Sequence, residues 1–137
     1  MRHRTLALFP LVAALALPAQ ASAKKEAAPP AEGPQYVALA PALISNVQSP
    51  GKPRFLRCEV QLHSGKPEAV PKLTLHGPAL RHALLLLFVE QEAATLQTPA
   101  GRDQLRQAAL EATRRVMKEL TGEPWIDELY FTSFYVQ

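Results

Sequence analysis

Cysteine is nearly absent from this sequence of 137 residues: Cys58 is the only one, so no disulfide bond can form within the chain. The familiar catalytic and nucleotide-binding motifs are missing too, since there is no HExxH, CxxC, GxSxG or P-loop. Asp127 and Glu128 are adjacent acids, but neighbouring side chains of a strand point to opposite faces and do not form a catalytic pair. We therefore expect no catalytic residue and no bound cofactor.

Histidine is scarce, with four residues, and none has a partner at metal-ligand spacing. His63 falls on the exposed face of a predicted strand, His76 lies near a predicted break, and His82 lies on a predicted helix. We expect surface or half-buried histidines and no metal site. A polar pocket holding at least two of these three histidines, Asp127 and Glu128 would instead indicate an enzyme or a small-ligand binder.

The N-terminus has the order of segments found in secretory signal peptides. A positively charged stretch, 1–4, precedes the apolar run 5–18, and an A-x-A site at 21–23 is followed at once by Lys24. The alternative is a short membrane anchor, but a spanning helix needs about 20 apolar residues, and this shorter run contains two prolines. We therefore predict a signal peptide over 1–23.

Neither sign of charge dominates the sequence. The sequence has 15 basic and 12 acidic residues, which gives a formal net charge of +3. Cleavage after Ala23 removes Arg2 and Arg4 and leaves 13 basic and 12 acidic residues, a charge of +1. The pI of about 9.2 is thus partly a property of the signal peptide. It does not indicate a nucleic-acid-binding surface, and we expect no nucleic acid partner.

The composition changes again near residue 35. Residues 24–34 (KKEAAPPAEGP) are rich in alanine, proline and charge without a periodic apolar pattern, which predicts a disordered spacer. The remaining residues, 35–137, are enough for one hydrophobic core. The elements described next predict a single small α+β domain, in which two main helices pack on an antiparallel or mixed sheet.

Two stretches in the first half of this domain are predicted to form strands. Residues 36–47 (YVALAPALISNV) are apolar, and Pro41 removes a backbone donor, so they form an edge strand or two short strands with a bend. Residues 55–63 alternate in polarity and predict a half-buried strand, whose core face carries Leu56, Cys58, Val60 and Leu62. The Cys58 thiol is therefore expected to be structural, with a reactive thiol as the alternative.

Residues 79–89 (ALRHALLLLFV) are the most apolar stretch after the N-terminus. Their leucines and alanines favour a helix that begins at Pro78, and eleven residues are too few to span a membrane. At 100° per residue, the predicted core face carries Leu80, Leu84, Leu87 and Phe88. The flank and the opposite side carry Leu85, Leu86 and Val89. These three would meet another part of the chain or a neighbouring subunit. Before this helix, the sequence is compatible with a short helix beginning at Pro67.

The stretch TPAGRDQLRQAALEATRRVMKEL predicts an amphipathic helix with Thr98 as N-cap, Pro99 in the first position and Gly122 as C-cap. Its predicted buried face carries Leu105, Ala109, Ala112, Val116 and Leu120. Basic residues on the other face alternate with acidic ones, which is usual for a solvated face. The alternative is a partner or acidic-lipid site, for which Arg106 and Arg114 are the candidates.

Residues 125–137 (WIDELYFTSFYVQ) are aromatic and β-branched and predict a terminal strand. Strict alternation puts large residues on both of its faces. One face would carry Tyr130, Phe134 and Val136, and the other would carry Leu129, Phe131 and Tyr135. Such a strand is usually covered on both sides, so we predict that it is central in the sheet.

Several of these segments together resemble the FliL family of flagellar basal-body-associated proteins. They are YVALAPALISNV, RFLRCEVQL, GPALRHALLLLF, TPAGRDQLRQAALEATRRVMKEL and the end YFTSFYVQ, in the family's order over most of 36–137. The resemblance implies a fold similar to stomatin-type domains. It also implies a non-enzymatic accessory role at the flagellar stator in motility and chemotaxis, and homo-oligomers. The family offers no catalytic or cofactor residue to carry over.

One feature departs from the family, whose members are typically anchored in the inner membrane by one N-terminal helix. Here a short apolar run with Pro10 and an A-x-A site stands in its place. If the run is cleaved, the resemblance implies a periplasmic protein held at the basal body by protein contacts; if not, a membrane-anchored one. The alternative function is a stomatin-like periplasmic scaffold with a non-flagellar client.

Overall fold

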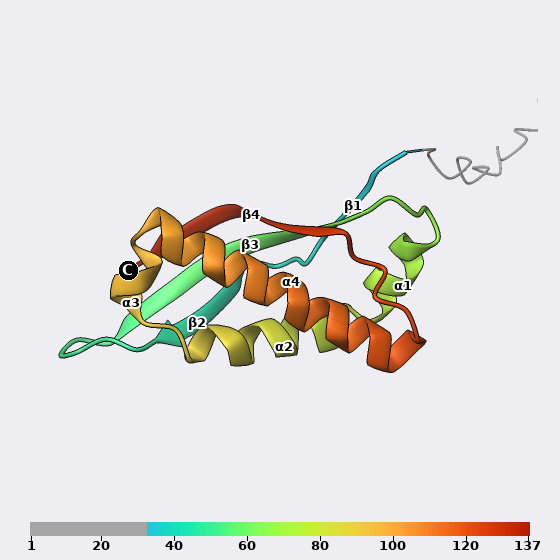
Figure 1. Ribbon diagram of the computed structural model, residues 1–137. Coiled ribbons are helices and arrows are strands. Elements are labelled where there is room, and N and C mark those ends of the chain that lie inside the picture. Colours follow the sequence, from blue (N-terminus) through green and yellow to red (C-terminus); the bar gives the residue numbers. More distant parts are fainter. Residues whose placement is uncertain (1–32) are drawn as a thin grey trace, which may run out of the picture.

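Residues 33–137 are described by the computed structural model, in which four strands form one antiparallel sheet and the two longest helices lie across one of its faces (Figure 1). The predicted α+β class and the single small domain are confirmed. The predicted signal peptide, 1–23, lies outside the described residues, as does the predicted spacer, 24–34, except for its last two residues.

The centre of the sheet is β3 (Arg54–Ser64), the longest strand. Two short strands pair along one edge of β3, both antiparallel to it. They are β1 (Gln35–Ala38) and β2 (Leu43–Val47). The strand β4 (Glu128–Val136) pairs along the other edge of β3. Of the two alternatives predicted for residues 36–47, the structure has the two short strands with a bend, because the chain leaves the ladder between β1 and β2 around Pro41.

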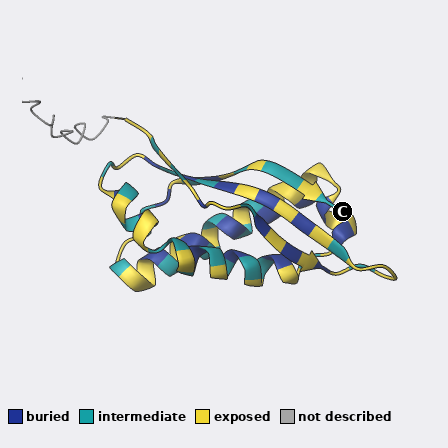
Figure 2. Cartoon of the chain, turned by 180° about the vertical axis from the view of Figure 1, so that it is seen from behind, coloured by how far each residue is buried: buried dark blue, intermediate teal, exposed yellow. Residues whose placement is uncertain are grey.

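The alternation predicted for β3 is also confirmed. Its buried side chains are Leu56, Cys58, Val60, Leu62 and Ser64, whereas Phe55, Arg57 and Glu59 are exposed. Buried and exposed residues accordingly alternate along the strands when the chain is viewed from behind (Figure 2). The sheet therefore buries one face against the helices, while much of the opposite face is open to solvent.

The predicted central position of the terminal strand is wrong. Among the described residues, β4 pairs only with β3 and forms an edge of the sheet. Glu59 is opposite Ser133 but Val60 is opposite Phe131, so Thr132 is an extra residue that makes a β-bulge. The bulge shifts the alternation, and it places Leu129, Phe131, Phe134 and Val136 together on the helix side. One face of β4 is therefore apolar and covered, not both.

Helices α1 (Ala69–Leu75) and α2 (Gly77–Val89) follow β3. The predicted core face of α2 is confirmed, with Leu80, Leu84 and Phe88 buried and Leu87 half-buried. The guanidinium of Arg81 donates hydrogen bonds to the carbonyl oxygens of Leu39 and Pro41, which ties α2 to the bend between β1 and β2. Within residues 33–137 we find no helix with the length and apolar character needed to cross a membrane.

The caps predicted for the longest helix are confirmed. After the short helix α3 (Ala93–Leu96), α4 (Pro99–Thr121) begins behind Thr98, whose hydroxyl accepts a hydrogen bond from the Gly101 amide at 3.0 Å. At its other end Gly122 adopts φ 88°, the left-handed conformation that glycine favours at this position. These local signals define both ends of α4.

The buried face of α4 differs from the predicted one. The buried residues recur every four positions and are Gly101, Leu105, Ala109, Thr113 and Met117. Ala112 and Val116 are half-buried, and the side chain of Leu120 is 52% exposed. Thr113 tolerates burial because its hydroxyl donates to the carbonyl oxygens of Ala109 and Leu110, both at 2.9 Å. An apolar pattern alone could not identify a threonine as a core residue.

Candidate interaction surfaces

The histidines are dispersed over the domain. His63 on β3 is half-buried with its ring 5.0 Å from that of Tyr36, and its Nδ1 has no hydrogen-bond partner among the described residues. His76 lies between α1 and α2, and His82 is exposed on α2. No group of three or more potential metal ligands occurs within residues 33–137.

The single thiol belongs to the core, as predicted from its place in β3. Cys58 is fully buried on the helix side of the sheet. Burial, helped by the neighbouring Glu59 carboxylate, raises the pKa of the Cys58 thiol to about 12. A thiol with such a pKa is almost entirely protonated at neutral pH and is a poor nucleophile.

The three apolar residues predicted to be left over on α2 are not equivalent. Leu86 is 55% exposed and Val89 is 45% exposed. Leu85 is half-buried and packs against the core. We call these three residues the α2 surface. Its two exposed members are three residues apart, so they lie on the same side of the helix.

The two arginines predicted as partner residues lie in one groove. This α4 groove has a volume of about 590 Å³ and is lined by Arg106, Gln107, Leu110, Glu111, Arg114, Arg115 and Glu128. Arg106 forms ion pairs within the chain, with Glu128 at 3.2 Å and Asp103 at 3.1 Å. Arg114, in contrast, is exposed, and it is therefore the better placed of the two to meet a partner.

The α2 surface and the α4 groove are separate. No residue of α2 lines the groove, and Glu128 of β4 forms part of its wall. The predicted interface residues thus divide into an apolar group on one helix and a basic group on another.

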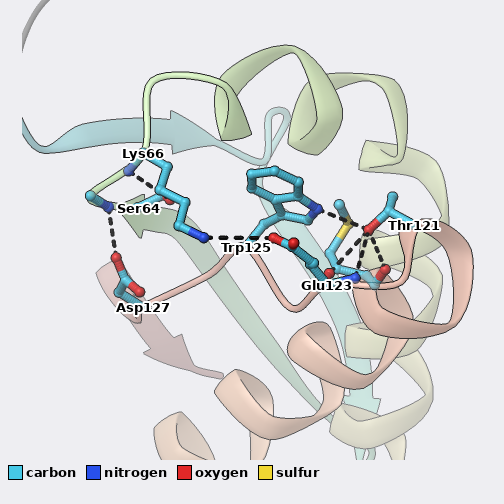
Figure 3. Close-up of polar contacts among 8 residues, drawn as sticks. Ser64, Lys66, Thr121, Glu123, Trp125 and Asp127 are labelled. Carbon is cyan, nitrogen blue, oxygen red and sulfur yellow. Dashed lines mark hydrogen bonds and ion pairs between the residues drawn. The ribbon is translucent and has the colours of Figure 1, made fainter.

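A polar cluster around Trp125 connects two loops at one end of the domain (Figure 3). The indole Nε1 donates to the Thr121 hydroxyl at 2.9 Å, and the Lys66 and Lys72 ammonium groups lie 5.2 and 5.0 Å from the ring centroid. Lys66 also pairs with Glu123 at 3.6 Å. Trp125 has φ 58°, an unusual value for a bulky residue. The cluster links the α4–β4 connection to the β3–α1 loop, so we assign it a structural role.

Asp127 belongs to the same end of the domain. Its carboxylate accepts a hydrogen bond from the Gly65 amide at 2.6 Å, whereas the neighbouring Glu128 pairs with Arg106. The two acids therefore have different partners.

Sequence reasoning missed a group of large exposed side chains that lie among polar residues on the outer face of the sheet. Five large side chains lie on the side away from the helices, namely Tyr36, Ile44, Phe55, Tyr130 and Tyr135. The large residues on both faces of 125–137 are the signal in the sequence, but they do not distinguish a covered face from an exposed one.

Comparison with known proteins assigns this fold to a family. The family described as flagellar basal body-associated protein FliL matches residues 36–137. The chain belongs to the FliL family. A flagellar protein FliL from Aquifex aeolicus (strain VF5) is 27% identical over 110 residues. That alignment covers 80% of this chain and 65% of the relative, so the match spans less than two thirds of the relative's length. The matched FliL region begins within β1 and includes the α2 surface and the α4 groove.

Proposed function

We propose that this FliL-family chain is a non-enzymatic accessory protein of the flagellar basal body that supports the motor and its stator in motility and chemotaxis. The observation that carries the proposal is the family match over residues 36–137. The α2 surface and the α4 groove support it, because both present side chains suited to protein contacts on a folded domain.

The partners that we propose are proteins of the stator or basal body and further copies of the chain. Leu86 and Val89 supply exposed apolar area for one contact, and Arg114 supplies charge for another. The location that we propose is the periplasm, at the inner-membrane basal body. The chain reaches it by export through residues 1–23, which anchor it in the membrane if they are retained.

A deletion strain tests the function. We expect reduced swimming speed in viscous medium and smaller rings in soft agar, with recovery when the wild-type gene is supplied. The variant Leu86→Glu should restore motility poorly, whereas Leu120→Glu should restore it fully. These two leucines are similarly exposed, at 55% and 52%, but only Leu86 belongs to the α2 surface. Normal swimming, swarming and chemotaxis of the deletion strain under load would contradict the proposal.

The location has its own test. N-terminal sequencing of the protein from fractionated cells should give a chain that begins at Lys24 in the periplasmic fraction. A chain that begins at Met1 and sediments with membranes would show the anchored form, and a cytoplasmic chain would contradict the proposed location.

A further inference from the structure

The two edges of the sheet differ in what they offer to another strand. One edge is divided between β1 and β2, with an interruption from residue 39 to residue 42. The other is β4, nine continuous residues that pair only with β3 among the described residues. A cavity of about 320 Å³ opens beside it, lined by Arg102, Asp103, Arg106, Tyr130, Phe131 and Phe134. An unpaired strand edge presents backbone N–H and C=O groups to which another strand can pair.

The hydrogen bonds to β3 determine which backbone groups of β4 point away from the sheet. Phe55 and Gln137 exchange both of their backbone hydrogen bonds, each at 2.9 Å. Bonded and unbonded pairs alternate along an antiparallel ladder, and the bulge at Thr132 shifts this alternation by one residue. The residues whose N–H and C=O groups face the free edge are therefore Leu129, Phe131, Phe134 and Val136.

We propose that a second copy of this chain pairs with that edge, β4 against β4, antiparallel and related by a two-fold axis. The four outward-facing residues allow one register in which all of them are used. In this register Phe131 is opposite Phe134 of the second copy, and Leu129 is opposite Val136 of the second copy. The two bulges then lie together on the axis, where they do not shift either half of the ladder.

The side chains match in this same register. Each Phe131 is opposite a Phe134 on the helix side, and each Tyr130 is opposite a Tyr135 on the outer face. Thr132 is opposite Ser133. Tyr130 and Tyr135 are 42% and 59% exposed in the single chain, so the pairing covers two side chains that the fold itself leaves in water. Aromatic pairs directly opposite one another stabilise antiparallel strands.

The charges are compatible with this pairing. Glu128 is the only charged residue of β4, and it is opposite the uncharged side chain of Gln137 of the second copy. Beside the strand, Arg102 and Arg106 are balanced by Asp103 and Glu128 in each copy, and Arg106 is already paired with both acids. The second copy therefore meets a surface with no net charge. The edge carries no lysine or proline, two residues that commonly protect exposed strand edges, and its one protective irregularity, the bulge at Thr132, lies on the proposed axis.

This interface gives the proposed oligomer a surface that is distinct from the α2 surface, and it does not depend on the flagellar role. Disulfide trapping tests its register. In Tyr130→Cys/Tyr135→Cys, the two new thiols are about 15 Å apart within one chain, too far to bridge, but directly opposite across the axis. We expect a covalent dimer under mild oxidation. Cys58 does not compete, because it is buried with a raised pKa.

The single variants Tyr130→Cys and Tyr135→Cys are the matched controls. Each leaves its thiol about five residues out of register with the same thiol of the second copy, so both should cross-link slowly. Cross-linking of the double variant no faster than that of either single variant would overturn the proposed register.

Sedimentation velocity over a concentration series tests the pairing without a covalent bond. Tyr130→Lys/Tyr135→Lys places like charges opposite each other twice per dimer and should raise the dimer Kd by about tenfold or more. Tyr130→Lys/Tyr135→Glu places opposite charges there and should restore dimerisation. Both variants alter exposed side chains, and circular dichroism verifies that they fold.

Two outcomes would overturn this interface. One is a wild type that stays monomeric, and the other is a dimer that is lost in Leu86→Glu but kept in the two-lysine variant. Neither result bears on the motility of the deletion strain.

Discussion

The two long helices of this domain lie on the same face of the sheet but are specified differently. Helix α4 has a hydrogen-bonded N-cap at Thr98 and a left-handed glycine after its end. Helix α2 has neither device, since His76 at its N-cap makes no side-chain cap hydrogen bond and Glu90 at its C-cap is right-handed. The stability of α2 depends on packing, whereas that of α4 depends on packing together with its caps.

The largest expected effect concerns packing in α2. Leu84→Ala removes a fully buried side chain and should lower the free energy of unfolding by about 2–5 kcal/mol. Leu86→Ala, two residues away and 55% exposed, should change it by less than about 0.5 kcal/mol. Urea denaturation of both variants measures the difference. Equal losses would mean that the inner and outer sides of α2 contribute alike.

Substituting one glycine in each helix tests how closely α4 and α2 approach neighbouring atoms at their N-termini. Gly101 lies in the first turn of α4, where an added Cβ would be 1.9 Å from the Thr95 carbonyl oxygen. Gly101→Ala must therefore displace α3, and it should cost about 1–3 kcal/mol. Gly77→Ala at the start of α2 meets no atom within 4 Å. It should be neutral or stabilising by up to about 1 kcal/mol. Thermal unfolding measures both, and a neutral Gly101→Ala would contradict the close approach of α3 and α4.

The smallest expected effect concerns the caps. Thr98→Ala removes the acceptor of the Gly101 amide and should cost about 1 kcal/mol. The corresponding His76→Ala at the N-cap of α2 removes no cap hydrogen bond and should cost less. Chemical denaturation at neutral pH compares the two. A larger loss at His76 than at Thr98 would show that the N-terminus of α2 is held by contacts other than a cap.

The sequence patterns predicted elements well where the deciding interactions are local. The cap residues of α4 and the alternation along β3 act over a few residues, and both predictions are confirmed. The prediction for β4 failed because the extra residue Thr132 shifts the alternation, and a bulge is visible only once the partner strand is known. The spacing of Leu120 predicts a core position on α4, but Leu120 is exposed and Thr113 and Met117 are buried instead.

The candidate surfaces were predicted in part. The α2 residues were identified because a helix with more apolar positions than one face can bury leaves some exposed. Pairing of Arg106 with Glu128, 22 residues away, was not predictable, since it depends on how α4 crosses β4. The large exposed side chains on the outer face of the sheet were not predicted for the same reason, because no pattern within one strand shows whether a second layer covers it.

The sequence by itself determined the α+β class, the ends of α4, the inward face of β3 and the resemblance to the FliL family, since each depends on short-range chemistry or on a pattern along the chain. Only the tertiary structure decided the order of the strands, the edge position of β4, the separation of the α2 surface from the α4 groove and the exposure of Tyr130 and Tyr135. The physical reason is that the burial of a residue and the pairing of a strand both depend on the segment that packs against them. A residue's own sequence neighbours do not specify what packs against it from elsewhere in the chain.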